Sequence, residues 1–246
     1  MFLLNKRISG LGKIGLTQLD RVEYFIDALK KQTEFDSITP YFIESKICSI
    51  APSLLLAEIS DILHYIVGSD HARYQFQYLS KKKILKYIIP ALDLLKKVPQ
   101  NKGKSRNAFE HTLGVIDCVP ADNTPLRWAA LFHDLGKHDS YLIDKNFLHH
   151  QKFSAEIADS LCVAYSVQHS DKVCSIVKNH MYPLDYQRRP DWSTKAIKTF
   201  IERCGAEHAL DVVEFSYYDK MSENNVPEFL KIIVELREKV KVILND

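Results

Sequence analysis

The most informative stretch of this 246-residue sequence is LRWAALFHDLGK, residues Leu126–Lys137. Its first seven residues are mostly apolar, as in a buried helix, and they lead directly into the doublet His133-Asp134. Polar side chains at the end of a buried helix are held rigidly while they face a cleft, so this doublet is a candidate pair of metal ligands. Gly136 is expected to cap the helix C-terminus. A second doublet, His138-Asp139, is expected to lie in a loop and to be incidental.

Apolar residues recur at helical spacing along almost the whole chain, which predicts an all-α fold. Capping signals mark four helix starts, at Thr17, at Thr39 before Pro40, at Asn107 with Glu110, and at Thr124 before Pro125. Further helices are expected over residues 53–67, 81–97, 153–168, 171–181, 194–204, 207–222 and 228–244, with glycine caps at Gly68 and Gly205. A short hairpin is weakly indicated around Tyr141–His150, with its turn at residues 144–146.

A polar stretch from Val98 to Arg106 has no apolar periodicity and contains a proline and a glycine. It predicts a boundary between an N-terminal helical segment, residues 1–98, and a C-terminal domain, residues 107–246. From Lys81 to Arg106, nine basic residues accompany a single acid, so this piece carries +8 although the whole chain carries +2. Such asymmetry is typical of contact with a phosphate-bearing partner such as tRNA, or else of a solvated helix face and loop.

The composition excludes several protein classes. With 46% hydrophobic and 26% charged residues the chain is an ordinary globular protein rather than a disordered one. No apolar run approaches the roughly 18 residues of a membrane span, and the apolar patch Phe2-Leu3-Leu4 is too short for a signal-peptide core. Five cysteines without a CxxC pair indicate reduced thiols. A cytoplasmic protein with no membrane contact is therefore expected.

The segment GLGKIG, residues Gly10–Gly15, matches the glycine pattern of dinucleotide-binding loops. In those loops a strand precedes the glycines, and a βαβ unit carries them. Neither is predicted in this helical chain, so the segment is interpreted as an N-terminal turn.

The histidines are concentrated in one part of the chain. Seven of the ten lie between His111 and His180. Clustered imidazoles with nearby carboxylates indicate a metal site with mixed nitrogen and oxygen ligands.

Two segments carry a family likeness: EHTL at Glu110–Leu113 and LRWAALFHDLGK at Leu126–Lys137. They resemble the signature of the HD-domain metal-dependent phosphohydrolase superfamily and, more narrowly, the HD region of bacterial CCA-adding tRNA nucleotidyltransferases. Looser similarity is found in Ile88–Leu92, Val98–Gln100, Phe147–Gln151, Asn179–Met181 and Tyr218-Asp219. The nucleotidyltransferase head of those enzymes is absent. The family's Gly-His-Glu also differs here, reading His149-His150-Gln151.

The resemblance implies an HD-domain helical bundle preceded by a smaller helical segment. Its metal ligands would be His111, His133, Asp134 and Asp219, with His150 and His180 available for a second ion. Asp211 lies on the same expected helix as Asp219 and is the alternative to it. Imidazole and carboxylate together suit Mn, Fe, Ni, Co or Zn better than Mg alone, as one or two divalent ions. The catalytic roles fall to Asp134, which would ligate and orient the nucleophile, and to Lys137, which would neutralise a phosphate oxygen. Alternatively, Lys137 is a solvated cap residue.

These residues predict a metal-dependent phosphohydrolase that acts through a metal-activated water. Its substrate would be a phosphorylated small molecule, a nucleotide or an RNA end, as a monoester or a 2′,3′-cyclic diester. Two alternatives stand beside this prediction. The first is a non-catalytic RNA-binding subunit that contacts tRNA through Lys81–Arg106, and the second is a diiron oxygenase built on the same ligands. No feature of the sequence specifies an oligomeric state.

Overall fold

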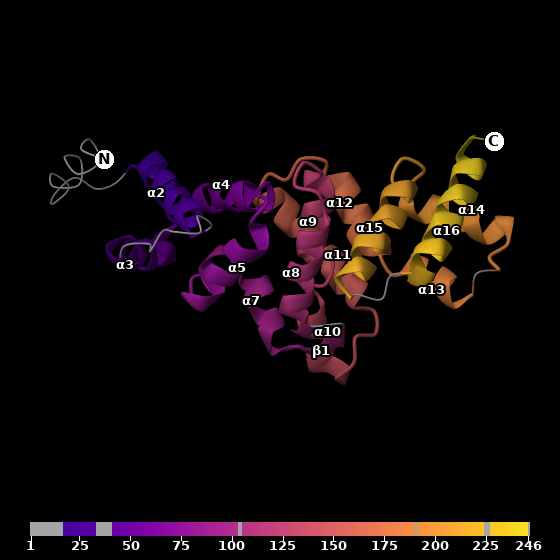
Figure 1. Ribbon diagram of the computed structural model, residues 1–246, viewed down its shortest axis with the longest axis horizontal. Helices are drawn as coiled ribbons and strands as arrows, with labels where there is room; N and C mark the ends of the chain where they lie inside the picture. Colours follow the sequence, from indigo (N-terminus) through magenta and orange to yellow (C-terminus); the bar gives the residue numbers. More distant parts are fainter. Residues whose placement is uncertain (1–16, 33–40, 103–104, 190, 224–226, 246) are drawn as a thin grey trace.

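The computed structural model describes residues 17–32, 41–102, 105–189, 191–223 and 227–245. Nearly all of this part is helical, and its one sheet is a two-stranded hairpin, so the predicted all-α fold class is confirmed. Along the long axis of the molecule, the N-terminal helices lie at the left end and the C-terminal ones at the right end (Figure 1). The segment Gly10–Gly15 and the cap predicted at Thr39 lie outside the described residues. None of the described helices is long and apolar enough to cross a membrane.

The N-terminal helices are α2 (Gln18–Lys31), α3 (Tyr41–Ile50), α4 (Leu56–Val67) and α5 (Ala72–Lys81), with a 3₁₀ turn η1 (Ala51–Ser53) between α3 and α4. Thr17 caps α2 as predicted, since its hydroxyl accepts from the Asp20 amide. The completely buried Glu58 of α4 pairs with Arg21 of α2 at 3.2 Å. This ion pair joins α2 to α4.

The single helix expected over residues 81–97 is wrong. In its place the structure has three short pieces, α6 (Leu85–Ile88), α7 (Pro90–Leu94) and the 3₁₀ turn η2 (Leu95–Lys97). Lys83 has a left-handed φ of 59°, which ends the preceding helix. Proline disfavours the helical region at the residue before it, and Ile89 accordingly adopts φ −145° and ψ 83° in front of Pro90.

The hairpin expected around residues 141–150 is also wrong, because residues Lys137–Asp144 form helix α10, which ends at the left-handed Lys145. A hairpin forms instead in the stretch predicted to be a linker. Strands β1 (Pro99–Lys102) and β2 (Ser105–Asn107) pair antiparallel there. The sequence of this piece is polar and gives no strand signal, because the pairing of the two strands depends on tertiary packing.

The central helices are α8 (Ala108–Cys118), α9 (Thr124–Phe132), α11 (His150–Ala164), α12 (Ser170–Asn179) and α15 (Ala209–Ser222). Asn107 caps α8 as predicted, accepting from the Glu110 amide at 2.9 Å. The N-cap of α9 is Asn123 rather than the predicted Thr124, because the Asn123 side chain accepts from the Leu126 amide. α9 packs against α8, α11, α12 and α15, so the helix that leads into His133 lies at the centre of the bundle.

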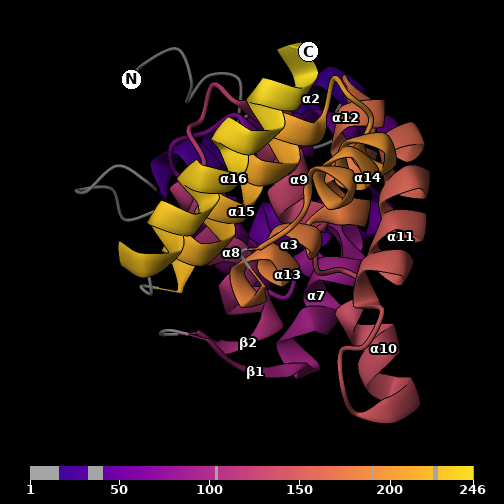
Figure 2. The same ribbon diagram turned by 90° about the vertical axis from the view of Figure 1, so that its right-hand side faces the viewer.

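Three C-terminal helices complete the chain: α13 (Tyr182–Arg188), α14 (Thr194–Cys204) and α16 (Pro227–Asn245). α16 packs against α13, α14 and α15, and it runs beside α15 in Figure 2. Gly205 ends α14 with a φ of 83°, and Gly68 ends α4, both as predicted. The positive φ explains the glycine at position 205.

The N-terminal helices pack on the central bundle, with α4 against α9 and α5 against α8. The buried Arg127 of α9 holds this junction. Its guanidinium donates to the carbonyls of Val119, Val67 and Ser69, the last two at the end of α4. One hydrophobic core extends across the junction. The division at residues 98 and 107 stays a prediction.

Replacement of Arg127 by lysine is expected to lower the free energy of unfolding by about 2 kcal/mol, since an ammonium does not reproduce the planar fork that serves three carbonyls. Urea denaturation measures this change. The control is Arg73→Lys, at an exposed pair with Asp117, where about 0.5 kcal/mol or less is expected. Equal losses in the two variants would show that Arg127 does not hold the junction.

Candidate metal centre

Five separate parts of the bundle bring six buried titratable side chains together. His111 lies within α8, Asp219 within α15, and His150 is the first residue of α11. His133 and His180 follow the last residues of α9 and α12, and Asp134 comes next after His133. These are the six metal ligands predicted from the sequence, and the structure places them in two adjacent groups of three: His111, His133 and Asp219, and Asp134, His150 and His180.

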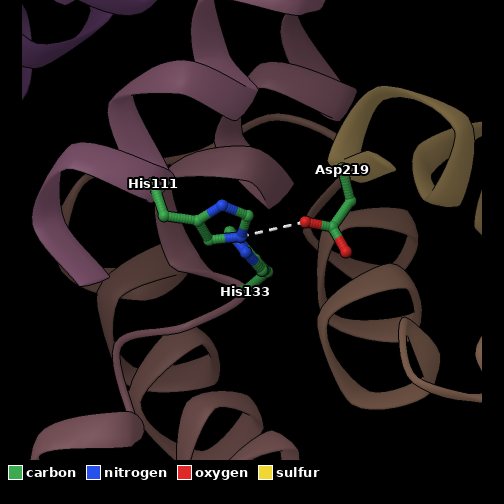
Figure 3. Close-up of side chains that lie close together, drawn as sticks. All are labelled: His111, His133 and Asp219. Atoms are coloured by element: carbon green, nitrogen blue, oxygen red, sulfur yellow. Dashed lines mark ion pairs between the residues drawn. The ribbon is translucent and has the colours of Figure 1, made fainter. Parts of the chain in front are cut away.

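The first group lies between α8, α9 and α15. In Figure 3 the rings of His111 and His133 converge, and the Asp219 carboxylate reaches toward them from the opposite side. His111 Nε2 is 3.0 Å from Asp219 Oδ1. Asp134 borders the same group, with its Oδ2 3.2 Å from His133 Nε2 and 3.7 Å from His111 Nε2. Two imidazole nitrogens and two carboxylates therefore face one small volume.

The second group uses the other oxygen of the same aspartate. Asp134 Oδ1 is 3.2 Å from His150 Nε2, and His150 Nε2 is 3.2 Å from His180 Nε2. The two oxygens of Asp134 thus face different groups. A carboxylate in this position can bridge two ions.

The outer nitrogen of each imidazole is held by a hydrogen-bond acceptor. Three of the Nδ1–H groups donate to backbone carbonyls three residues earlier in the chain: His133 to Ala130, His150 to Phe147 and His180 to Val177. His111 Nδ1 lies 3.3 Å from the Ser222 hydroxyl, which itself donates to the Asp219 carbonyl and so accepts from the imidazole. In neutral imidazoles this fixes the Nε2 lone pairs toward the centre.

Burial acts on the protonation of these residues. Burial and the neighbouring His150 lower the pKa of His180 to about 3, so it is neutral and able to ligate at physiological pH. Burial likewise lowers the pKa of His111. For Asp134, burial favours the neutral acid, but His133 and Lys137 outweigh it and hold the pKa well below the usual value. The reverse holds for His133, where burial lowers the pKa but Asp134 produces a net rise.

Lys137 is buried beside this centre and is not a solvated cap residue. Its ammonium lies 2.5 Å from Asp134 Oδ2 and 2.6 Å from Gln100 Oε1 of β1. The same nitrogen is 5.4 Å from the centre of the Phe147 ring. A fixed positive charge therefore stands directly beside the central carboxylate, where an anionic ligand would also meet it.

The second doublet was expected in a loop, but it lies in the first turn of α10. Gly136 has an ordinary helical φ of −73° and is the N-cap residue of α10, so its predicted role as a C-terminal cap is wrong. His138 and Asp139 contact each other at 3.2 Å, and the Asp139 side chain is 54% exposed. They do not join the centre. His149 and His169 are exposed as well.

The neighbours of Gly136 leave no room for a side chain at this position. Its amide donates to Ser154 Oγ at 2.9 Å, and a Cβ atom at this position would lie 2.4 Å from the Ser154 amide nitrogen. The chain after Asp134 thus runs directly against α11, the helix that begins with His150. Sequence reasoning missed this role of Gly136, along with the roles of Ser222 and Gln100.

Replacement of Ser222 by alanine is expected to weaken divalent metal binding about tenfold to a hundredfold, because His111 Nδ1 loses the acceptor that fixes its tautomer. Competition with a chelating dye measures the affinity. The control is Ser160→Ala on α11, an exposed hydroxyl that donates to the Glu156 carbonyl. A metal affinity unchanged in Ser222→Ala would contradict the assigned tautomer.

The donor set fits a divalent transition metal. It combines the Nε2 atoms of four histidines with two carboxylates, and His150 Nε2 lies 3.2 Å from His180 Nε2 while the outer nitrogen of each ring is bonded to a backbone carbonyl. In neutral imidazoles the two Nε2 lone pairs would repel each other at this distance, and a cation between them would remove the repulsion. His111, His133, Asp134 and Asp219 would hold one ion, and Asp134, His150 and His180 a second.

Comparison with known proteins agrees with this geometry. No curated protein matches the chain. Residues 108–207 match the family model of the HD domain. The matched region contains five of the six candidate ligands, and Asp219 lies beyond its end. Over residues 108–207 the chain is therefore similar to the HD domain.

Proposed function

We propose that the chain is a metal-dependent phosphohydrolase that acts on a nucleotide or an RNA-terminal phosphate ester, either a monoester or a 2′,3′-cyclic diester. The observation that carries this proposal is the position of Asp134, whose two oxygens face two groups of metal-type donors while Lys137 lies beside it. The HD-domain superfamily consists largely of metal-dependent phosphohydrolases, which supports the same reaction class.

A bound divalent ion supplies a hydroxide nucleophile near neutral pH and polarises a phosphoryl oxygen. The chain's own residues do the rest. Asp134 is ionised and buried, so it can accept a hydrogen bond from the attacking water and fix the direction of attack. Lys137 presents a positive charge in the same buried volume, where it would stabilise the negative charge that grows on the phosphoryl oxygens in the transition state.

The narrower substrate class, an RNA end, is supported by the basic stretch from Lys81 to Arg106. Among its described residues Lys81, Lys83, Lys86, Lys97 and Arg106 are exposed, and Lys96 pairs with Asp93. Exposed cations of this kind suit a nucleic-acid backbone. They also support the alternative of a non-catalytic RNA-binding subunit related to the CCA-adding enzymes.

The reaction class is tested by a panel of phosphoesters assayed with added Mn, Ni, Co or Mg. The panel contains nucleoside monophosphates, 2′,3′-cyclic nucleotides and RNA ends of both kinds. Turnover that requires a divalent metal and is lost in His133→Ala is the expected result. The absence of bound metal and of turnover across the panel would overturn the proposal.

RNA binding separates the catalytic proposal from its alternative. Phosphate contacts make affinity fall steeply with salt. Salt-sensitive tRNA binding that persists in His133→Ala, in a protein without turnover, would favour the non-catalytic subunit. The diiron oxygenase alternative would instead require a visible absorption band that depends on iron.

A further inference from the structure

A cavity of about 710 Å³ lies away from the metal-type donors, between α13 and α14. None of the six candidate metal ligands lines it. Its volume falls within the range of about 300–1,000 Å³ that is typical of sites for small organic ligands. The lining combines two kinds of side chain, aromatic rings and cations.

The aromatic part consists of Tyr182, Trp192 and Phe200. The ring of Phe200 lies 6.0 Å from that of Trp192 and 6.5 Å from that of Tyr182, measured between centroids. Trp192 is only half-buried, so part of its ring remains accessible from the cavity. Accessible aromatic faces of this kind accept a planar heterocycle by stacking.

The charged part is strongly basic. Arg188, Arg189, Lys195 and Arg203 line the cavity against one acid, Asp185. Arg188 pairs with Asp185 at 3.4 Å, whereas Lys195 and Arg189 form no ion pair with any described residue. The first turn of α14, which Ser193 caps, also lies in the wall and adds the positive end of a helix dipole. The cavity therefore attracts an anion.

One contact pair shows how the two parts are joined. The guanidinium of Arg203 donates to the Tyr182 hydroxyl and lies over the Tyr182 ring, with its central carbon 5.0 Å from the ring centroid. The Arg203 carbonyl accepts from Asn179, the residue before His180. This pair fixes a cation and an aromatic ring side by side at one end of the cavity.

We propose that this cavity binds a nucleoside phosphate, with the base on the Trp192 side and the phosphate among Lys195 and the arginines. A planar ring and an anionic group in one ligand match the two parts of the lining, and neither part alone accounts for both. The same chemistry occurs in a free nucleotide and at the 5′-phosphorylated end of an RNA strand. The site is separate from the metal centre and does not depend on the proposed hydrolysis.

The test is a titration of the full chain with adenosine 5′-monophosphate in the presence of a chelator, so that no metal-dependent turnover occurs. Binding is followed by calorimetry and by tryptophan fluorescence. The chain has two tryptophans, and the other one, Trp128, is 2% exposed, so quenching by a stacked base reports on Trp192. Adenosine and inorganic phosphate are titrated separately, and a 5′-phosphorylated oligoadenylate distinguishes an RNA end from a free nucleotide.

Lys195→Glu is expected to weaken nucleotide binding at least tenfold. Lys198→Glu is the matched control, because Lys198 is exposed on the same helix but does not line the cavity. Trp192→Leu is expected to weaken binding of the nucleotide and to leave that of inorganic phosphate unchanged. The proposal is overturned by any of three results: no binding at millimolar nucleotide, phosphate alone binding as tightly as the nucleotide, or equal losses from Lys195→Glu and Lys198→Glu.

Discussion

Replacement of Asp134 by asparagine is expected to lower metal-dependent phosphoester hydrolysis by about a thousandfold or more, a loss of about 4 kcal/mol of transition-state stabilisation. The carboxylate lies 3.2 Å from His133 through one oxygen and 3.2 Å from His150 through the other. Loss of its charge therefore weakens both groups of donors and removes the orienter of the attacking water. Steady-state kinetics with saturating metal measure the effect.

Alanine at the same position is expected to be equally inactive, but it also removes the Asp134 carboxylate from beside the buried Lys137 ammonium. The asparagine variant keeps the shape and an acceptor for that ammonium, and its circular dichroism shows whether it is folded. The control is Asp139→Ala in the second doublet, where the exposed side chain predicts activity within about twofold of the parent and a stability change of at most about 0.5 kcal/mol. If Asp139→Ala is folded but inactive, the site has been assigned to the wrong residues.

Replacement of Gly136 by alanine is expected to cost about 3 kcal/mol or more of unfolding free energy. The new Cβ would lie 2.4 Å from the Ser154 nitrogen and 2.5 Å from the His150 carbonyl oxygen, both backbone atoms that no rotamer change can move aside. The backbone at Gly136 has a φ of −73°, which alanine adopts freely, so the penalty is steric. Thermal and urea denaturation measure it.

The matched control for this substitution is Gly68→Ala, where the new Cβ would meet nothing closer than 3.4 Å. That variant is expected to be neutral or slightly stabilised. Because α11 begins with His150, the Gly136→Ala protein that remains folded is also expected to bind divalent metal more weakly. An alanine tolerated at both positions would show that α11 does not pack directly on the chain after Asp134.

Local sequence rules predicted much of this fold because the interactions behind them are local. Thr17 and Asn107 cap their helices through amides three residues ahead, and a single sequence contains both partners of such a bond. The expected helix over residues 81–97 was wrong for the opposite reason. Apolar spacing continues through that segment, but the backbone at Lys83 and before Pro90 is not helical. The positions of the resulting short pieces depend on packing.

The candidate ligands were predictable because residue type and context point to them, but their arrangement was not. His133, His150 and His180 each donate to a carbonyl three residues earlier, a local device that sequence alone does not separate from a solvent-facing histidine. The supporting roles of Ser222 and Gln100 depend on α15 and β1 reaching the centre from distant parts of the chain. A serine or a glutamine is a common residue, so the sequence at these positions gives no indication of a role at the metal centre.

Every role given above to the six buried side chains depends on their binding divalent metal. Crystals of the full chain grown with saturating Mn²⁺, with diffraction data collected at the manganese absorption edge, test it most directly. Anomalous peaks are expected among His111, His133 and Asp219 and among Asp134, His150 and His180, at about 2.0–2.2 Å from their nitrogen and oxygen atoms. Crystals of the folded chain grown with Mn²⁺ that show no anomalous density at either group would contradict metal binding by these side chains.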